Sequence, residues 1–220
     1  MKKPVLALVA ALIFPLTSGN FSTYQAPKQA QHCPPQIKPI YGKLHHIKAV
    51  IQKEGGYQNH PYDQANRGAG TKYGITPATY KAFTGKQPTA AAMKALSKAE
   101  ATAIYDKLWQ QSNMDLLPDE VAGCVFDFYI NTPKTAMQVI ERITQTSGSA
   151  KALAINQSAA KAIAQNPNFC HALKDARAHY YQYRAAKYNQ SDWHRYFKKI
   201  GKTGSPQNRQ FLRGWLARIA

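Results

Sequence analysis

A stripe of apolar side chains at helical spacing leads to the first acidic residue of the chain. Leu44, Ile47, Val50 and Ile51 recur every three or four positions, as in an amphipathic helix. Glu54 lies three residues after Ile51 and seven after Ile47, so it continues the same stripe. The pattern predicts a helix whose core-facing side ends in a carboxylate. A terminal Glu that bends out to solvent fits the same spacing.

Two glycines follow this acid. Gly55 and Gly56 end the predicted helix, because glycine adopts the backbone conformations found at helix ends and lets another segment approach closely. Partial burial raises the pKa of a carboxyl group and keeps its proton available near neutral pH. Glu54 is therefore a candidate general acid.

Helix-start signals recur along the rest of the chain, whereas strand patterns are scarce. Thr-Pro pairs at 76–77 and 132–133 each place a capping residue before a proline, and Ser97 with Glu100 forms a capping box. Only the segment 57–75 has room for a small hairpin. The predicted class is all-α, mainly helical, with possible space for one small β-hairpin near the candidate active site. Further helices are expected over 119–130, 133–144, 158–164, 168–188 and 206–218.

The N-terminus has the pattern of an export signal. Lys2 and Lys3 precede an apolar stretch, 5–16, that is shorter than the roughly 20 residues of a membrane span. We expect residues 1–19 to be a signal peptide or a signal-anchor, and the Pro-rich residues 20–40 to be a linker. The protein is then exported to the periplasm or the extracellular space, with or without a transient membrane tether.

Charge is the strongest compositional signal. The 220 residues contain 29 Lys and Arg against 11 Asp and Glu, a net charge of +18. From residue 150 onward 13 basic residues face only Asp175 and Asp192. This excess predicts attraction to an anionic bacterial envelope, although a merely solvated face is the simpler alternative. Because no nucleic-acid-binding signature accompanies the charge, we expect no specific nucleic-acid partner.

The chain has three cysteines, Cys33, Cys124 and Cys170. In an exported protein a disulfide is allowed, and we expect it between Cys124 and Cys170, which both lie in predicted helices. The alternative is that all three remain thiols, with Cys124 packed as a small apolar residue. No Cys/His spacing suits zinc, so neither a metal nor a cofactor is expected.

The stretch that follows Glu54 carries the most specific motif. The string EGGYQNHPYDQANRGAGTKYGIT, residues 54–76, contains Asp63 and Thr71 ahead of a glycine turn. It resembles the EGGY…D…GG.T..GIT pattern of glycoside hydrolase family 108, the N-acetylmuramidase family, and resembles phage-type lysozymes less closely. The loop between Asp63 and Thr71 is about three residues longer than the usual family form.

Two weaker motifs follow in the family's order. Residues 125–131, VFDFYIN, resemble the family's FDxxxN helix, with Gln138 seven positions later. Residues 176–181 and 211–218 are similar to the ARxxYY…FxxGWxxR segment of the family's peptidoglycan-binding region.

The resemblance extends over roughly residues 41–218 and implies a lysozyme-like fold in two parts. Residues 41–131 would form the catalytic region. Residues 132–220 would form a helical peptidoglycan-binding region packed on the catalytic part, because no flexible linker separates the two.

The resemblance also implies a reaction, namely hydrolysis of the β-1,4 bond between N-acetylmuramic acid and N-acetylglucosamine in peptidoglycan. Glu54 would protonate the leaving oxygen, and Asp63 and Thr71 would position water or stabilise the oxocarbenium-like charge. Asp63 could instead cap its own loop. We expect a monomer that binds glycan strands.

Five further residues are candidates for substrate contact: Tyr57, Tyr73, Asp127, Asn131 and Trp215. The two tyrosines could stack on sugar rings or could be ordinary core aromatics. Asp127 lies between two phenylalanines and is either a buried hydrogen-bond anchor or a cleft residue. The spacing of Trp215 suits the core as well as a glycan contact.

Two other functions remain open on the sequence. One is a basic, non-catalytic cell-wall-binding protein, and the other is a chitinase-like glycosidase. Glu54 separates the first from an enzyme, because a binding module needs no proton donor at the end of an apolar stripe.

Overall fold

The computed structural model describes residues 41–60, 68–185, 208–217 and 219, and its described elements are helical. The predicted signal segment 1–19 and linker 20–40 lie outside the described residues, as do Cys33 and Asp63. The helices are α1 (Gly42–Glu54), α2 (Pro77–Thr84), α3 (Ala90–Ala95), α4 (Lys98–Gln111), the 3-10 helix η1 (Met114–Leu116), α5 (Asp119–Tyr129), α6 (Pro133–Thr144), α7 (Ser149–Ala152), α8 (Gln157–Ala164), α9 (Phe169–Arg184) and α11 (Arg209–Ala217).

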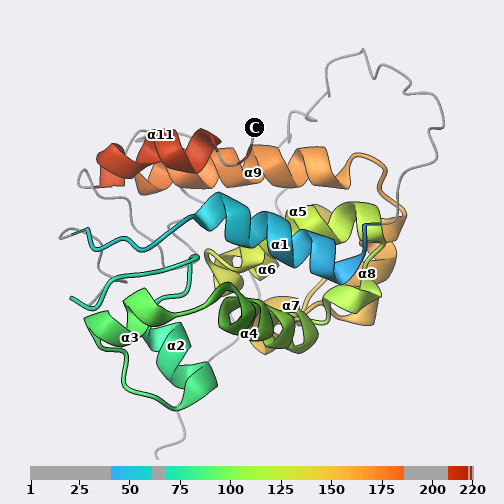
Figure 1. Cartoon of the computed structure of the whole chain (residues 1–220). Helices are drawn as coiled ribbons and strands as arrows, with labels where there is room; N and C mark the ends of the chain where they lie inside the picture. The colour runs from blue at the N-terminus through green and yellow to red at the C-terminus, as the bar shows by residue number, and fades with distance from the viewer. Residues whose placement is uncertain (1–40, 61–67, 186–207, 218, 220) are drawn as a thin grey trace, which may run out of the picture. The chain divides into compact units, whose positions relative to one another are not determined.

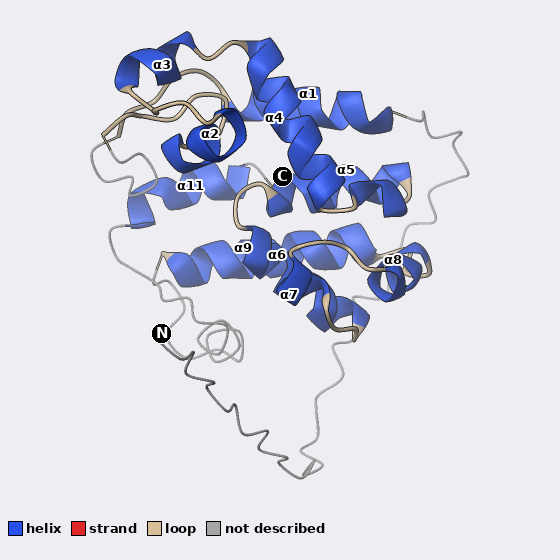
Figure 2. Cartoon of the chain, turned by 90° about the horizontal axis from the view of Figure 1, so that it is seen from below, coloured by secondary structure: helices blue, strands red, loops and turns tan. Residues whose placement is uncertain are grey.

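The predicted all-α class is confirmed. The described part of the chain forms no named strand, and the segment after α1 is drawn as loop (Figure 2). It contains only two isolated antiparallel bridges, Gln58 with Thr71 and Lys72 with Ile75. The segment 57–75 was expected to have room for a small hairpin, and its described residues form only these two single-pair bridges. In the described residues no helix is both long and apolar enough to span a membrane.

Local sequence signals account for most helix starts. The Ser97–Glu100 capping box is present in full, and the Thr76 hydroxyl accepts a hydrogen bond from the Thr79 amide at 3.2 Å. The Thr132 side chain makes no such bond, although Pro133 does open α6. The capping role expected of Thr132 was wrong, because its backbone lies at ψ 77° rather than in the extended form of Thr76.

Helix α5 lies at the centre of the core. Its fully buried side chains include Val125, Phe126 and Phe128. Helix α1 packs against α4 and α5, whereas α6 and α9 pack against α5, and α11 lies along α9 (Figure 1). The helices that follow residue 132 thus share one core with those that precede it.

A disulfide joins Cys124 of α5 to Cys170 of α9, the pair that the sequence indicated. Their Cα atoms lie 6.3 Å apart, inside the usual range for a disulfide. Closing a loop of 46 residues restricts the unfolded chain, so the bond stabilises the contact between these two helices.

A carboxylate of α5 fixes the start of α1. Asp119 accepts hydrogen bonds from the Tyr41 amide at 2.6 Å and the Gly42 amide at 3.0 Å, and its Oδ1 lies 2.9 Å from His46 Nε2. Burial of the Asp119 carboxyl opposes ionisation, but the His46 hydrogen bond and the two amides outweigh it and lower its pKa. Helix α1 therefore approaches the core from a fixed position.

Candidate active site

The apolar stripe of α1 places its terminal acid at the edge of the core. Ile47, Val50 and Ile51 are buried, and Glu54 at the end of the same face is half-buried. Gly55 ends the helix at φ 71° and donates its amide to the Ile51 carbonyl at 3.3 Å. The positive φ is the reason that the helix stops here, since it is readily adopted by glycine.

A glycine turn packs against the side chain of Glu54. A Cβ atom built on Gly74, which has φ +75°, would lie 2.6 Å from Glu54 Cγ and Cδ and 2.6 Å from Tyr105 Oη. The Tyr105 hydroxyl donates to the Tyr73 carbonyl at 2.7 Å, and the Tyr73 amide donates to the Gly55 carbonyl at 3.1 Å. The turn is thus tied to both α1 and α4, and only a residue without a side chain fits beside the acid.

The described segments that end at residue 60 and begin again at residue 68 meet in one pair of residues. Gln58 and Thr71 exchange both backbone hydrogen bonds at 2.7 Å, which brings half-buried Thr71 back beside the chain that leaves Glu54. The Tyr57 hydroxyl donates to the Ala69 carbonyl at 3.1 Å. A Cβ on Gly70 would lie 2.5 Å from the Tyr57 ring, so the ring lies flush against the returning backbone.

Two lysines cover the rings of the candidate tyrosines. Lys94 Nζ lies 5.3 Å from the centroid of the Tyr57 ring, and Lys72 Nζ lies 5.2 Å from that of the Tyr73 ring. Lys72 also donates to the Lys94 carbonyl at 2.5 Å, which links the turn to α3. Cation–π contacts of this kind hold the two rings in place and make the neighbourhood basic.

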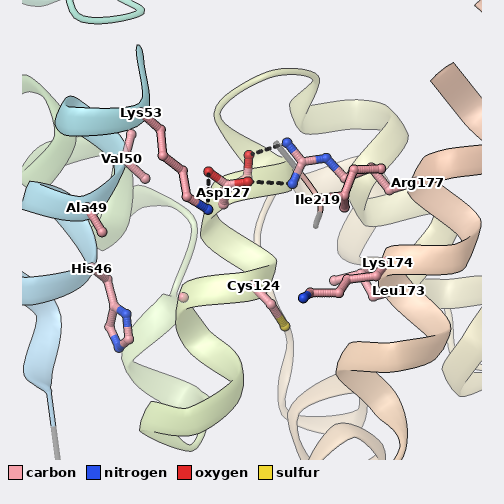
Figure 3. A pocket seen from close by; sticks show the side chains of 11 residues that line it. His46, Ala49, Val50, Lys53, Cys124, Asp127, Leu173, Lys174, Arg177 and Ile219 are labelled. Atoms are coloured by element: carbon pink, nitrogen blue, oxygen red, sulfur yellow. Dashed lines mark hydrogen bonds and ion pairs between the residues drawn. The ribbon is translucent and has the colours of Figure 1, made fainter. Parts of the chain in front are cut away.

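Asp127 and Asn131 have a different setting. Asp127 is 6% exposed, and its Oδ2 lies 2.5 Å from Nη1 of Arg177, which is itself 3% exposed (Figure 3). Arg177 also donates to the Asp127 carbonyl at 3.2 Å and to the Tyr181 hydroxyl at 2.9 Å. Exposed Asn131 donates to the Asp127 carbonyl at 2.8 Å. These contacts favour the interpretation of Asp127 as an anchor between α5 and α9.

Trp215 lies on α11, beside the Tyr181 ring whose hydroxyl accepts from Arg177. It is half-buried, with its ring centroid 5.3 Å from that of Tyr181 and 5.9 Å from that of Phe211. Phe211 in turn makes an edge contact with His60, at 5.2 Å between centroids. The aromatic residues of α11 therefore connect α9 with the segment that follows Glu54.

The sequence reasoning missed two residues that organise these groups. Tyr105 could have been found from the apolar stripe of α4, where Ala101, Ile104 and Trp109 are also buried. Arg177 lies within a recognised motif, but only the three-dimensional pairing reveals it as the partner of Asp127. Within the described ranges no group of three or more His, Cys, Asp or Glu side chains is placed to hold a metal ion.

Helix α1 ends in a half-buried carboxylate beside a glycine turn, an arrangement that suits the acid of a glycoside hydrolase. Residues 47–132 match the family model named glycosyl hydrolase 108. The segment contains Glu54, the glycine turn and α5, and the match confirms the resemblance for the motifs that lie within it.

A solved structure supports the fold over a longer stretch. The structure of Brucella abortus SagA is similar to this chain with a TM-score of 0.54 and 25% sequence identity. The similarity covers 79% of this chain and 92% of SagA. No curated protein matches the sequence.

Proposed function

We propose that this glycoside hydrolase cleaves the β-1,4 bond between N-acetylmuramic acid and N-acetylglucosamine in peptidoglycan, with Glu54 as the general acid. The observation that carries the proposal is the position of Glu54 at the open end of a buried helix face, packed beside Gly74 and Tyr105. A carboxyl group in such a position can act on the leaving oxygen of a bound glycan as a general acid.

The other groups have supporting roles. Departure of the protonated oxygen leaves an oxocarbenium-like sugar, which water must then attack. Asp63 and Thr71 would position that water or stabilise the charge, and Thr71 is held opposite Gln58 by two backbone hydrogen bonds. Tyr57 and Tyr73 would line the sugar cleft. The C-terminal helices, with Trp215, would bind the glycan strand beyond the reacting bond.

The charge and the disulfide support a place of action outside the cytoplasm. A protein with a net charge of +18 is attracted to an anionic envelope. The bond between Cys124 and Cys170 supports an oxidising compartment, such as the periplasm or the exterior. Both agree with an N-terminal export signal.

Mass spectrometry of fragments released from purified peptidoglycan tests the proposal. The wild-type protein should release fragments with muramic acid at the reducing end, and Glu54→Gln should release none. Binding without release by either protein would favour a wall-binding module. Cleavage of soluble chitin oligosaccharides in preference to peptidoglycan would favour the chitinase-like alternative.

A further inference from the structure

A pocket of about 240 Å³ opens between α1, α5 and α9, and Lys53 of α1 lines it (Figure 3). It is distinct from the glycine turn beside Glu54, because none of the turn's residues line it. The residues that line it are His46, Ala49, Val50, Lys53, Gly123, Cys124, Asp127, Leu173, Lys174, Arg177 and Ile219.

The wall of this pocket is cationic. It contains the side chains of Lys53, Lys174 and Arg177 and one carboxylate, Asp127. Arg177 holds Oδ2 of that carboxylate at 2.5 Å, whereas Lys53 Nζ lies 3.9 Å from Oδ1, beyond normal hydrogen-bond distance. Lys174 makes no ion pair with any described residue. Lys174 therefore has no acid partner among the described residues, and Lys53 has only this long ion pair with Asp127, so both ammonium groups can take a further anion.

The remaining lining is apolar and narrows the choice of anion. Ala49, Val50, Leu173 and Ile219 contribute hydrocarbon, and Cys124 contributes the disulfide. No Ser, Thr, Asn or Gln side chain lines the described pocket. Phosphate sites usually offer several hydroxyl or amide donors, whereas a carboxylate on a short aliphatic chain needs a cationic point and an apolar wall. The pocket matches the second ligand.

We propose that this pocket binds a carboxylate of the peptide stems attached to the glycan strand, with Lys53 and Lys174 as the anion-binding residues. The proposal rests on the proposed function, because it assigns a second contact to the same substrate. Lys53 and Glu54 are neighbours in the last turn of α1, so the Lys53 side of the pocket lies close in sequence to the candidate acid. Binding of a stem would thus help to place a sugar bond at Glu54.

The first experiment compares intact glycan strands with strands from which an amidase has removed the peptides. The amidase hydrolyses the amide bond to each stem and frees the lactyl carboxylate, so the stripped strands remain anionic and control for general attraction to a basic protein. We expect Lys53→Gln/Lys174→Gln to lower the ratio of kcat/KM for intact over stripped strands about fivefold to tenfold, as loss of a charged contact worth about 1 kcal/mol or more would do. Lys48→Gln is the matched control, since Lys48 is exposed on the same helix but does not line the pocket. An unchanged ratio in the double variant would overturn the proposal.

A binding measurement separates this proposal from the catalytic one. Amide resonances of α1, α5 and α9 in the Glu54→Gln protein would be followed by NMR during titration with a synthetic stem tripeptide. The tripeptide with free carboxylates should shift the pocket resonances, and the same tripeptide with amidated carboxylates should bind at least fivefold more weakly. Equal binding of the two peptides, or no binding of either, would overturn the pocket assignment whether or not the protein is hydrolytic. Binding of the free-carboxylate peptide, together with a wild-type protein that hydrolyses no glycan, would keep the pocket and overturn the muramidase proposal.

Discussion

Glu54 and Asp127 are two acids on the core-facing sides of helices, but their burial and their partners differ. Glu54 is half-buried at a helix end, where a glycine turn and a tyrosine hydroxyl pack beside it. Asp127 is buried in the middle of a helix and is held by the guanidinium of Arg177. A carboxylate paired with a buried cation cannot be removed without leaving that cation unpaired, whereas a carboxyl group at an accessible helix end can exchange a proton with a substrate.

The largest effect is expected from Glu54→Gln. Removal of the proton donor should lower kcat/KM on peptidoglycan by about 10²–10⁴-fold, the usual contribution of a general acid. The circular dichroism spectrum and the thermal midpoint should stay close to those of the wild type, because glutamine keeps the shape of the side chain. Glu120→Gln, at an exposed position of α5, is the control and should retain activity.

Asp127→Asn should show the opposite pattern. It leaves the buried charge of Arg177 without its counterion, which costs about 3–5 kcal/mol of the free energy of unfolding. Chemical denaturation would measure the loss. Asp106→Asn is the matched control, because the ion pair of Asp106 with Lys43 is more than one-third exposed on both sides and contributes at most about 1 kcal/mol. Equal losses in the two variants would contradict the anchoring role of Asp127.

Gly74→Ala sharpens the account of how Glu54 is placed. The new methyl group meets Glu54 and Tyr105 at 2.6 Å, so the acid must move, and kcat/KM should fall about tenfold. Gly85→Ala is the matched control, because Gly85 has a similar φ of +71° but no atom lies within 4 Å of an added Cβ. Both variants should lose about 1 kcal/mol of stability from backbone strain, but only Gly74→Ala should lose activity.

The smallest effect concerns Asp119 and its dependence on pH. The pKa of Asp119 is lower in the folded protein than its ordinary value of 3.8, so the ionised group stabilises the fold. This contribution is present above the ordinary value and is lost as the pH falls through the folded value. Asp119→Asn should cost about 1 kcal/mol at neutral pH, as loss of a helix cap does, and should flatten the decline in stability below pH 4. Urea denaturation at pH 7 and pH 3 would check both; a variant that declines as steeply as the wild type would contradict this role.

Much of the fold could be predicted because it depends on local signals. The Ser97–Glu100 box and the proline that opens α6 act within a few residues, and α4 and α6 begin at these signals. The apolar residues Ile47, Val50 and Ile51 likewise set which face of α1 is buried. The predicted helix over 168–188 begins as α9 at Phe169, and α9 ends at Arg184.

The site could be predicted only in part because it depends on contacts between distant segments. Glu54 follows from its own helix, but Tyr105 reaches the glycine turn from another helix, 32 positions after Tyr73. Arg177 meets Asp127 across 50 positions of sequence. The periodicity of the sequence does not predict contacts between residues so far apart. The sequence alone therefore could not decide whether Asp127 is a buried anchor or a cleft residue.

The most direct test places the two acids in one assay. Release of reducing-end muramic acid from purified peptidoglycan would be measured for wild type, Glu54→Gln and Asp127→Asn at equal concentrations of folded protein. The account predicts no release by Glu54→Gln and near wild-type release per folded molecule by Asp127→Asn. If Glu54→Gln still released muramic acid, the assignment of Glu54 as the general acid would be contradicted. The same would follow if only the folded Asp127→Asn protein failed to release it.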